Sequence, residues 1–165
     1  IRDRMGRIEI SRATERTLPI VARVHAESWR ASHRSFCTPA FVQAHTAERQ
    51  ERFFRAEAAA GKAVYLLTDD GEPAGVVTVH ESLIENLYVA PDRQGCGYGT
   101  RLLRFAMAAC SGTPALTVLT NNLRAIRLYE KNGFAFTGKR MDYPASGVSE
   151  AEMRWQGDAC PERAN

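Results

Sequence analysis

A glycine-rich segment at residues 89–100, VAPDRQGCGYGT, restricts the fold of this chain more than any other feature, because it joins a predicted strand to a predicted amphipathic helix. A helix start presents unpaired N–H groups and roughly half a positive charge, and glycines let the backbone approach an anion without an intervening side chain. The segment therefore predicts a phosphate-binding cradle, and pyrophosphate is a suitable ligand for it. A loop of this composition can equally be a tight turn without a ligand, so its surroundings have to decide.

Hydrophobic periodicity places the loop within an alternating pattern of strands and helices. The predicted strands cover residues 7–12, 63–68, 74–80, 83–89, 115–120, 134–140 and 151–156. The predicted helices run from a cap at Thr14 or Thr17 to about residue 32, and over residues 38–61, 100–110 and 123–131. We expect an α/β (α+β) fold with a mixed sheet, in which strands joined through helices pair in parallel and the hairpin at residues 63–80 adds antiparallel members.

The domain organisation follows from the length of the chain and from its lack of internal repeats and linkers. The 165 residues are the usual size of one domain, and they contain no repeat and no linker, so we predict a single domain over residues 1–165. Residues 1–4 precede Met5, a plausible native start, and are interpreted as a cloning remnant or an upstream extension. The polar residues 157–165 are expected to form a flexible tail.

Charge and cysteine content narrow the classes of function. The net charge of +3, with basic residues interspersed among acids, argues against a nucleic-acid binder. No apolar run approaches the roughly 20 residues that cross a bilayer, so no membrane association is expected. Cys37, Cys96, Cys110 and Cys160 show neither C-x-x-C spacing nor paired histidines, which indicates no metal site and no disulfide framework. Free thiols favour a reducing compartment, and we predict a cytoplasmic protein.

Two common phosphate-binding motifs do not fit the loop. A P-loop needs a Lys-Ser/Thr pair after its last glycine, whereas Gly99 is followed by Thr100-Arg101. A dinucleotide fold needs G-x-G-x-x-G directly after the first strand, and here the loop follows the fourth predicted strand with G-x-G-x-G spacing. A nucleotide-phosphate enzyme would also need metal-binding acids nearby, and Asp92 alone is close in sequence.

The loop resembles the signature of the Gcn5-related N-acetyltransferase (GNAT) superfamily, Gln/Arg-x-x-Gly-x-Gly/Ala, at Gln94, Gly97 and Gly99. The segments LYVAP at residues 87–91 and NLRAIRLYEKNGF at residues 122–134 are similar to the blocks that flank this signature in the family, and ESWR in the first helix is similar to one branch of it. The resemblance implies a GNAT-like mixed, mostly antiparallel sheet flanked by helices. Its parallel strands would splay apart at the coenzyme A site.

The resemblance also implies a reaction and a cofactor site. Acetyl-CoA would donate its acetyl group to a primary amine of a small molecule or peptide, by direct attack and without a metal. The loop amides would hold the pyrophosphate, and the end of the fourth strand would pair with the pantetheine arm through its main chain. The implied cofactor-binding residues are Leu87, Tyr88, Val89, Gln94, Gly95, Cys96, Gly97, Tyr98, Gly99, Thr100, Asn122 and Ala125.

Tyr129 and Glu85 are the candidates for the two proton transfers. Asn122 and Tyr129 are seven positions apart and share a helix face. The resemblance implies that Tyr129 protonates the departing thiolate. Alternatively, Asn122 caps the helix and Tyr129 packs in the core. The amine must also lose a proton, and Glu85, which should share strand parity with Leu87 and Val89, is the candidate base.

The base has alternatives in Glu81 and in a water relay. Many relatives carry an acid at the position of Leu83 or of Thr117, where this chain has none. Such a gap also fits a non-catalytic acyl-CoA sensor or interaction module on the same fold, which is the alternative function, although Tyr129 argues against it. Cys96 has no evident histidine partner, so covalent catalysis is disfavoured.

The acceptor is expected to contact the first helices and the connection between the last two strands. Trp29, Arg30 and Tyr143 are the candidate contacts. The remaining aromatic and polar residues of these segments are His33, Phe36, Met141 and Asp142. The resemblance further implies a homodimer.

Overall fold

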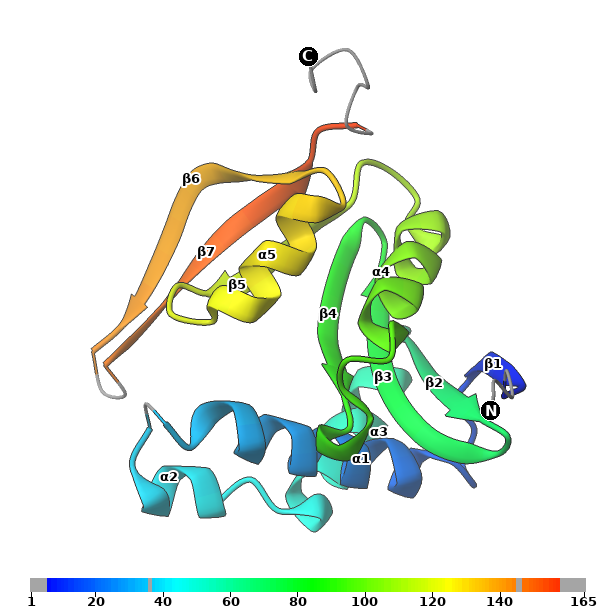
Figure 1. The fold of residues 1–165 in the computed structure, drawn as a ribbon. Helices are drawn as coiled ribbons and strands as arrows, with labels where there is room; N and C mark the ends of the chain where they lie inside the picture. The colour runs from blue at the N-terminus through cyan, green and yellow to red at the C-terminus, as the bar shows by residue number, and fades with distance from the viewer. Residues whose placement is uncertain (1–5, 36, 145–146, 158–165) are drawn as a thin grey trace.

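The computed structural model describes residues 6–35, 37–144 and 147–157. Its strands are β1 (Ile8–Arg12), β2 (Ala63–Asp69), β3 (Glu72–His80), β4 (Leu83–Val89), β5 (Ala115–Leu119), β6 (Phe134–Tyr143) and β7 (Val148–Trp155). Its helices are α1 (Leu18–His33), α2 (Pro39–Gln43), α3 (Ala47–Ala59), the 3₁₀ turn η1 (Pro91–Arg93), α4 (Tyr98–Ala109) and α5 (Leu123–Lys131). The strands form one sheet in the order β1-β2-β3-β4-β5-β7-β6 (Figure 1), which confirms the predicted mixed, mostly antiparallel fold.

Helices cover both faces of the sheet. α1 and α3 pack on one face, where Val21 and Phe54 contact a core that includes Val76 of β3. α4 and α5 lie on the other face, where Leu102 packs with Val77, the next residue of β3. Because successive side chains of a strand point to opposite faces, both faces of β3 are buried, and residues 74–79 form an uninterrupted apolar or small run.

The direction of each strand follows from the helices that precede it. One helix, α4, returns the chain from the end of β4 to the starting end of β5, and these two strands are parallel. Between β1 and β2 the chain passes through both α1 and α3, which pack against each other, and β1 and β2 are antiparallel. The expectation of parallel pairing across helices was therefore wrong for this pair, because a hairpin of two helices brings the chain back to the end that it left.

The parallel pairing of β4 with β5 is short, and this shortness creates the site. It joins Leu83 to Ala115 and Ile84 to Leu116, and it ends there. Beyond this point the two strands diverge, as Figure 1 shows. The edge of β4 from Glu85 to Val89 is left without a neighbouring strand on the β5 side, whereas its other edge pairs with β3.

Two predicted segments were wrong in their boundaries. The helix expected over residues 38–61 is divided into α2 and α3, because the Thr46 side chain accepts a hydrogen bond from the Arg49 N–H and starts a new helix. The last strands are longer than predicted, since a bulge at Gly138 (φ +96°) interrupts the alternation and pairing with β7 resumes at Arg140. Tyr143, expected in a connection together with Met141 and Asp142, therefore ends strand β6.

Several expectations concern the surface and the chain ends. Residues 1–4, residues 158–165 of the expected tail, Phe36 and Cys160 lie outside the described residues. None of the described helices combines the length and the apolar character that a membrane span requires.

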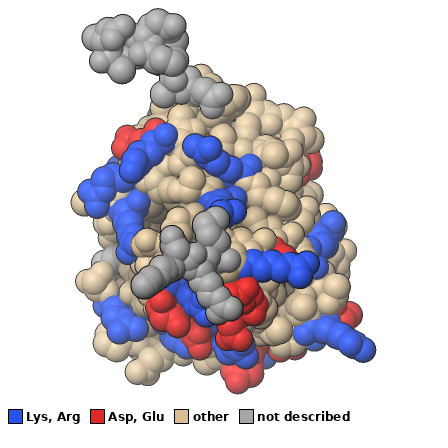
Figure 2. Space-filling view, turned by 45° about the vertical axis from the view of Figure 1, so that its right-hand side comes forward, with Lys and Arg blue, Asp and Glu red and all other residues tan. Residues whose placement is uncertain are grey.

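On the face shown in Figure 2, Lys and Arg side chains occur in separate groups, and Asp and Glu side chains gather at the lower part of the view.

Candidate active site

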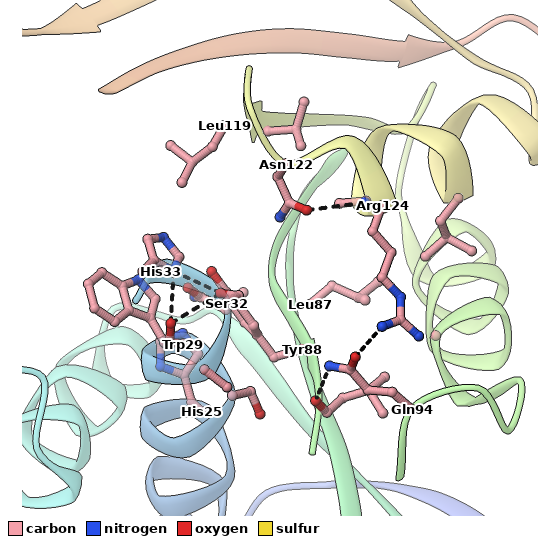
Figure 3. Close-up of a pocket in the computed structure, with 18 of the residues that line it drawn as sticks. His25, Trp29, Ser32, His33, Leu87, Tyr88, Gln94, Leu119, Asn122 and Arg124 are labelled. Carbon is pink, nitrogen blue, oxygen red and sulfur yellow. Dashed lines mark hydrogen bonds between the residues drawn. The ribbon is translucent and has the colours of Figure 1, made fainter. Parts of the chain in front are cut away.

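A cleft of about 1270 Å³ opens where β4 and β5 diverge. It is lined by α1, the start of α3, β4, the glycine loop, β5 and α5, together with one residue of β7. Figure 3 shows that the α1 side chains, among them His25 and Trp29, lie across from Asn122 and Arg124 of the α5 region, with Leu87 and Tyr88 of β4 between them. Segments that are far apart in the sequence thus meet at the open edge of β4.

The glycine loop presents its backbone to this cleft. Gly95 and Gly97 adopt φ values of +83° and +84°, in the left-handed region that favours glycine, and no heavy atom lies within 4 Å of a Cβ built at either residue. Gly97 caps α4, so the helix begins at Tyr98, two residues earlier than predicted. Thr100 and both glycines line the cleft. The unpaired N–H groups of the first helical turn therefore lie beside open space, as a phosphate cradle requires.

Two loop side chains do not face the cradle. The Tyr98 hydroxyl donates a hydrogen bond to the Asp69 carboxylate, which ties the loop to the end of β2. Cys96 is exposed and is absent from the residues that line the cleft, and its thiol lies 3.9 Å from the Gln94 carbonyl oxygen. Tyr98 itself still lines the cleft, whereas Cys96 does not.

Polar and basic side chains frame the outer part of the cleft. Gln94 donates a hydrogen bond to the Val89 carbonyl oxygen over 3.4 Å, and Arg124 donates one to the Gln94 side chain (Figure 3). These bonds connect the loop, β4 and α5. The basic residues that line the cleft on this side are Arg93, Arg124, Arg127 and Lys131. Their positive charge favours an anionic ligand beside the loop.

α5 and its N-cap bring three sequence-predicted residues to the cleft. The Asn122 side chain caps the helix by accepting the Ala125 N–H over 3.2 Å, and both residues line the cleft. Tyr129 is 7% exposed and also lines it, and burial raises the pKa of its hydroxyl to about 12. This hydroxyl makes no hydrogen bond with the described part of the chain. Tyr129 thus packs in the core and still reaches the cleft as a protonated phenol.

Glu85 lines the cleft, but the expected parity was wrong. Glu85 lies opposite Thr78 and Tyr88 lies opposite Val76, so Glu85 shares a face with Tyr88 and not with Leu87. The cause is a bulge at Asn86, which adopts φ +54° and adds one residue to β4. Side chains on the face of Tyr88 contact α1 and α3, whereas Leu87 and Val89 pack toward α4.

The Glu85 carboxylate has a fixed partner on this face. Lys62, directly before β2, lies 3.0 Å from it and also 3.0 Å from Glu57. The hydrogen bond that Lys62 donates to Glu85, together with the one that it donates to Glu57, raises the pKa of the Lys62 ammonium despite the opposing effect of burial. Glu81, the second candidate base, is 78% exposed beside His80 and does not line the cleft. Thr117 lines the cleft and Leu83 does not.

An aromatic stack forms the wall on the α1 side. The Trp29 ring lies between the rings of His33, 3.9 Å away, and His45, 3.5 Å away, with interplanar angles of 10° and 11°. Burial lowers the pKa of His33 to about 4 and also lowers that of His45, so both rings are neutral at pH 7. Arg30 donates a hydrogen bond over 2.6 Å to the His45 carbonyl oxygen and, like Tyr143, does not line the cleft.

Sequence reasoning missed His25, which lies deeper in this wall. Its ring is 4% exposed and packs edge-on against Tyr88 and Phe54, with centroids 4.8 and 5.0 Å away. Nδ1 lies 3.2 Å from the Gln50 side-chain amide, and Nε2 is buried without a hydrogen-bond partner among the described residues. Burial, more than any charged neighbour, lowers the pKa of His25 to about 3. A histidine among apolar helix residues carries no pattern that would have identified it.

Glu150 of β7 also lines the cleft and was missed. It lies opposite Leu119 of β5. The signal was hidden because the last strand was expected to start at residue 151, which left Glu150 in a connection. Among the described residues, no group of three or more His, Cys, Asp or Glu side chains could hold a metal ion.

Part of this chain is similar to known acetyltransferases in sequence. Residues 60–135 match the model of the acetyltransferase (GNAT) domain. Over 75 residues the chain is 34% identical to the peptidyl-lysine N-acetyltransferase YjaB of Salmonella typhimurium, a region that covers 44% of this chain and 50% of the relative. The chain thus spans about half the length of the curated relatives that it matches.

Solved structures match over nearly the whole chain. The apo form of YjaB from Escherichia coli has a TM-score of 0.70 and 22% identity, covering 91% of this chain and 98% of that chain. The PaiA N-acetyltransferase from Thermoplasma acidophilum, in complex with coenzyme A, has a TM-score of 0.68 and 17% identity, covering 90% and 99%. At these identities the likeness shows a shared fold.

Proposed function

We propose that this chain, a member of the Gcn5-related N-acetyltransferase (GNAT) superfamily, transfers the acetyl group of acetyl-CoA to a primary amine. One observation carries the proposal: the open edge of β4, the glycine cradle and the protonated Tyr129 hydroxyl border a single cleft. A similarity to peptidyl-lysine N-acetyltransferases favours a lysine side chain of a peptide as the acceptor over a small-molecule amine.

The residues present fit acetyl-CoA in two places. Gly95 and Gly97 leave free the space that a Cβ would fill, so the backbone amides from Gly95 to Thr100 can approach a pyrophosphate closely. The β4 edge at Leu87, Tyr88 and Val89 has no strand partner toward β5, so its main chain can pair with an extended pantetheine arm.

The basic residues at the outer end and the α5 start complete this half of the cleft. The side-chain oxygen of Asn122 accepts the hydrogen bond that caps α5, which leaves the side-chain N–H groups of Asn122 for the pantetheine arm. The small Ala125 leaves room beside them. Arg124 can exchange its bond to Gln94 for a phosphate oxygen.

The chemistry needs one acid and one base. The amine nitrogen attacks the thioester carbonyl carbon, a C–N bond forms, the C–S bond breaks, and the sulfur takes the proton of the Tyr129 hydroxyl. The nitrogen releases its remaining extra proton to solvent as the amide forms, and solvent returns a proton to the Tyr129 phenolate. Tyr129 is suited to this step because its raised pKa keeps it protonated until the thiolate forms. Glu85 and a water relay are the candidates for the base, although Glu85 would have to act while bound to Lys62.

We propose further that the chain acts as a single domain, in the cytoplasm and as a homodimer. The alternative function is a non-catalytic acyl-CoA sensor. A sensor would bind acetyl-CoA without transferring its acetyl group to an amine, so measuring turnover distinguishes the two. A monomeric mass in light scattering would overturn the dimer.

Thermal unfolding with acetyl-CoA, CoA or ATP-magnesium tests the proposal without knowledge of the acceptor. A ligand at about 100 times its Kd adds roughly 2.7 kcal/mol, or a shift of about 5 to 10 °C for a domain of this size. Stabilisation by both CoA species and not by ATP supports the cradle. No shift with either CoA species would leave the loop a structural turn and overturn the proposal.

A further inference from the structure

Glu150 is a carboxylate on the side of the sheet from which an acceptor can approach. In β5 and β7 the paired residues Leu116 and Met153 belong to the core beneath α4 and α5. Leu119 and Glu150, an odd number of residues away from them, point to the opposite face, which is the face of Glu85 and Tyr88.

This opposite face is open around Glu150. α1 and α3 cover β2, β3 and β4, and Thr117 on β5 is already exposed. The cleft extends into this open region, because it is lined by Thr117, Leu119 and Glu150 as well as by Trp29. The side chains of Leu87, Ala125 and Tyr129 pack on the other face of the sheet, toward α4 and α5. Glu150 and the aromatic stack therefore border the half of the cleft that the cofactor leaves free.

Glu150 differs from the other acidic residues of this region in having no cation bound to it. The described residues form neither a hydrogen bond nor an ion pair with its side chain, whereas Glu85 is bound to Lys62 and Glu152 to Arg154. The pKa of the Tyr88 hydroxyl is raised first by burial, then by Tyr129 and then by the charge of Glu150, so Glu150 lies close enough to Tyr88 to interact with it. Glu150 is thus half-buried, lines the cleft and is free to bind a cation from outside.

We propose that Glu150 is the catalytic carboxylate of the acceptor side, which binds the protonated primary amine and takes its proton before the amine attacks the thioester. The inference rests on the proposed acetyl transfer and adds the residue that selects a cationic amine. The ammonium N–H bond breaks and an O–H bond forms on Glu150, and the nitrogen lone pair then forms the C–N bond. Glu85 serves, in this assignment, to hold Lys62 and the end of α3.

The charged and titratable side chains that face this half of the cleft come from several elements. Glu85 and Tyr88 come from β4 and Tyr129 from α5. On the opposite wall, His25 and His33 come from α1, His45 from the turn between α2 and α3, and Arg49 from the start of α3. The histidines are neutral at pH 7 because burial lowers their pKa values. They therefore do not repel an ammonium group bound to Glu150.

The experiment compares Glu150→Gln with Glu152→Gln. Glu152 lies on the same face of the same strand and does not line the cleft, so its variant controls for the loss of a carboxylate from β7. The probes are a peptide with blocked ends and one lysine, a peptide with a free N-terminus and no lysine, and n-butylamine. Acetylation is followed by mass spectrometry, and calorimetry measures acetyl-CoA binding and probe binding to the CoA-loaded protein.

At pH 7.5 we expect Glu150→Gln to lower kcat/KM for the acetylated probe by about 10²- to 10⁴-fold, the range of general acid–base catalysis. Probe affinity should fall at least tenfold, whereas acetyl-CoA affinity and melting temperature should match those of Glu152→Gln. The loss should shrink toward pH 10, since an alkyl amine with a pKa of about 10.4 then arrives partly deprotonated. Glu150→Asp keeps the carboxylate and should retain part of the activity.

The outcomes separate this inference from the proposed function. A wild-type protein that binds no acetyl-CoA would overturn the function itself. Equal activity of Glu150→Gln and Glu152→Gln in an active protein would overturn the role of Glu150, and so would a loss that stays the same from pH 7.5 to pH 10. A wild-type protein that binds acetyl-CoA but neither binds nor acetylates any of the three amines would also count against an ammonium site.

Discussion

Glu85 and Tyr88 point to the same face of the sheet, although they are separated by an odd number of steps along β4. Asn86 causes this relationship by adopting φ +54° and forming a bulge between them. The bulge directs Glu85 and Tyr88 toward α1 and Leu87 toward α4, at the point where β4 leaves β5. It therefore determines which side chains of β4 lie on the α1 and α3 face of the sheet and which lie on the α4 face.

Asn86→Val should destabilise the fold and reduce acetyl transfer, because a β-branched residue in the left-handed region costs about 1–2 kcal/mol and favours a regular strand. Asn86→Gly should stay within about 0.5 kcal/mol of the wild type, since glycine adopts this conformation readily. Urea unfolding measures the first effect and acetyl-CoA turnover the second.

Glu81→Val is the matched control for this bulge. Glu81 also has a positive φ, +56°, but it lies outside the cleft. We expect a similar loss of stability with normal turnover. Equal turnover of Asn86→Val and Glu81→Val at a temperature where both are folded would show that the bulge does not shape the site.

The stability of the protein should decrease on acidification through the buried histidines. The pKa values of His25 and His33 are lowered to about 3 and about 4, chiefly by burial, from about 6.5 in the unfolded chain. Between pH 6.5 and pH 4 the unfolded chain binds protons that the folded chain does not, so the free energy of unfolding falls as the pH falls. Each histidine should remove about 2 kcal/mol between pH 7 and pH 5.

Urea unfolding of the wild type and of His25→Gln at pH 7 and pH 5 tests this linkage. The variant lacks one of the histidines with a lowered pKa, so its free energy of unfolding should fall by about 2 kcal/mol less between pH 7 and pH 5 than that of the wild type. An identical pH dependence in both proteins would mean that His25 is protonated in the folded state.

The sequence predicted the elements on the loop and α5 side of the cleft better than those on the α1 and β7 side, and the reason is physical. The cofactor half is built from a continuous loop and one short helix, α5, whose bounds were predicted without error, and it acts largely through backbone. Local glycine spacing and helical periodicity are sufficient to place such groups. The mostly antiparallel character of the sheet and the divergence of its parallel strands then followed from the family resemblance.

The acceptor half depends on contacts between distant segments. Periodicity assigns parity correctly until a residue such as Asn86 or Gly138 adopts a positive φ, and then every later side chain changes face. Trp29 was identified, but its stacking with His45 depends on the turn between α2 and α3. Glu150 was missed for a related reason, since the bulge in β6 concealed the length of the last hairpin.

Gly97→Ala should weaken acetyl-CoA binding as well as stability. Gly97 holds φ +84° at the start of α4, and alanine in the left-handed region costs about 1 kcal/mol. A shift of the loop to relieve this strain would turn the first amides of α4 away from the pyrophosphate. We expect the Kd for acetyl-CoA, measured by calorimetry, to rise at least tenfold.

Gly71→Ala provides the comparison, because Gly71 has φ +83° and equally open space but lies in the β2–β3 turn, away from the cleft. It should lose a similar free energy of unfolding and keep its affinity for acetyl-CoA. If the two variants bind acetyl-CoA equally well, the conformation of Gly97 matters for folding alone.

Tyr129→Phe separates the role of the phenol in catalysis from its role in the core. The ring packs near Phe134, with centroids 6.1 Å apart, and phenylalanine keeps this packing while it removes the hydroxyl. The hydroxyl makes no hydrogen bond with the described part of the chain, so stability and acetyl-CoA affinity should change little. Turnover should fall about 10²-fold or more, because the thiolate would have to leave without a proton donor.

The pH dependence of turnover gives an independent test of the same residue. Burial raises the pKa of Tyr129 to about 12, so its hydroxyl stays protonated up to about pH 11. Between pH 8 and pH 10, the pH dependence of kcat should therefore have the same shape in the wild type and in Tyr129→Phe. Tyr65→Phe, on β2 and outside the cleft, should behave as the wild type throughout. If Tyr129→Phe retained full turnover at pH 7.5, the thiolate would have to leave unassisted or take its proton from water, and the role of Tyr129 would be limited to packing.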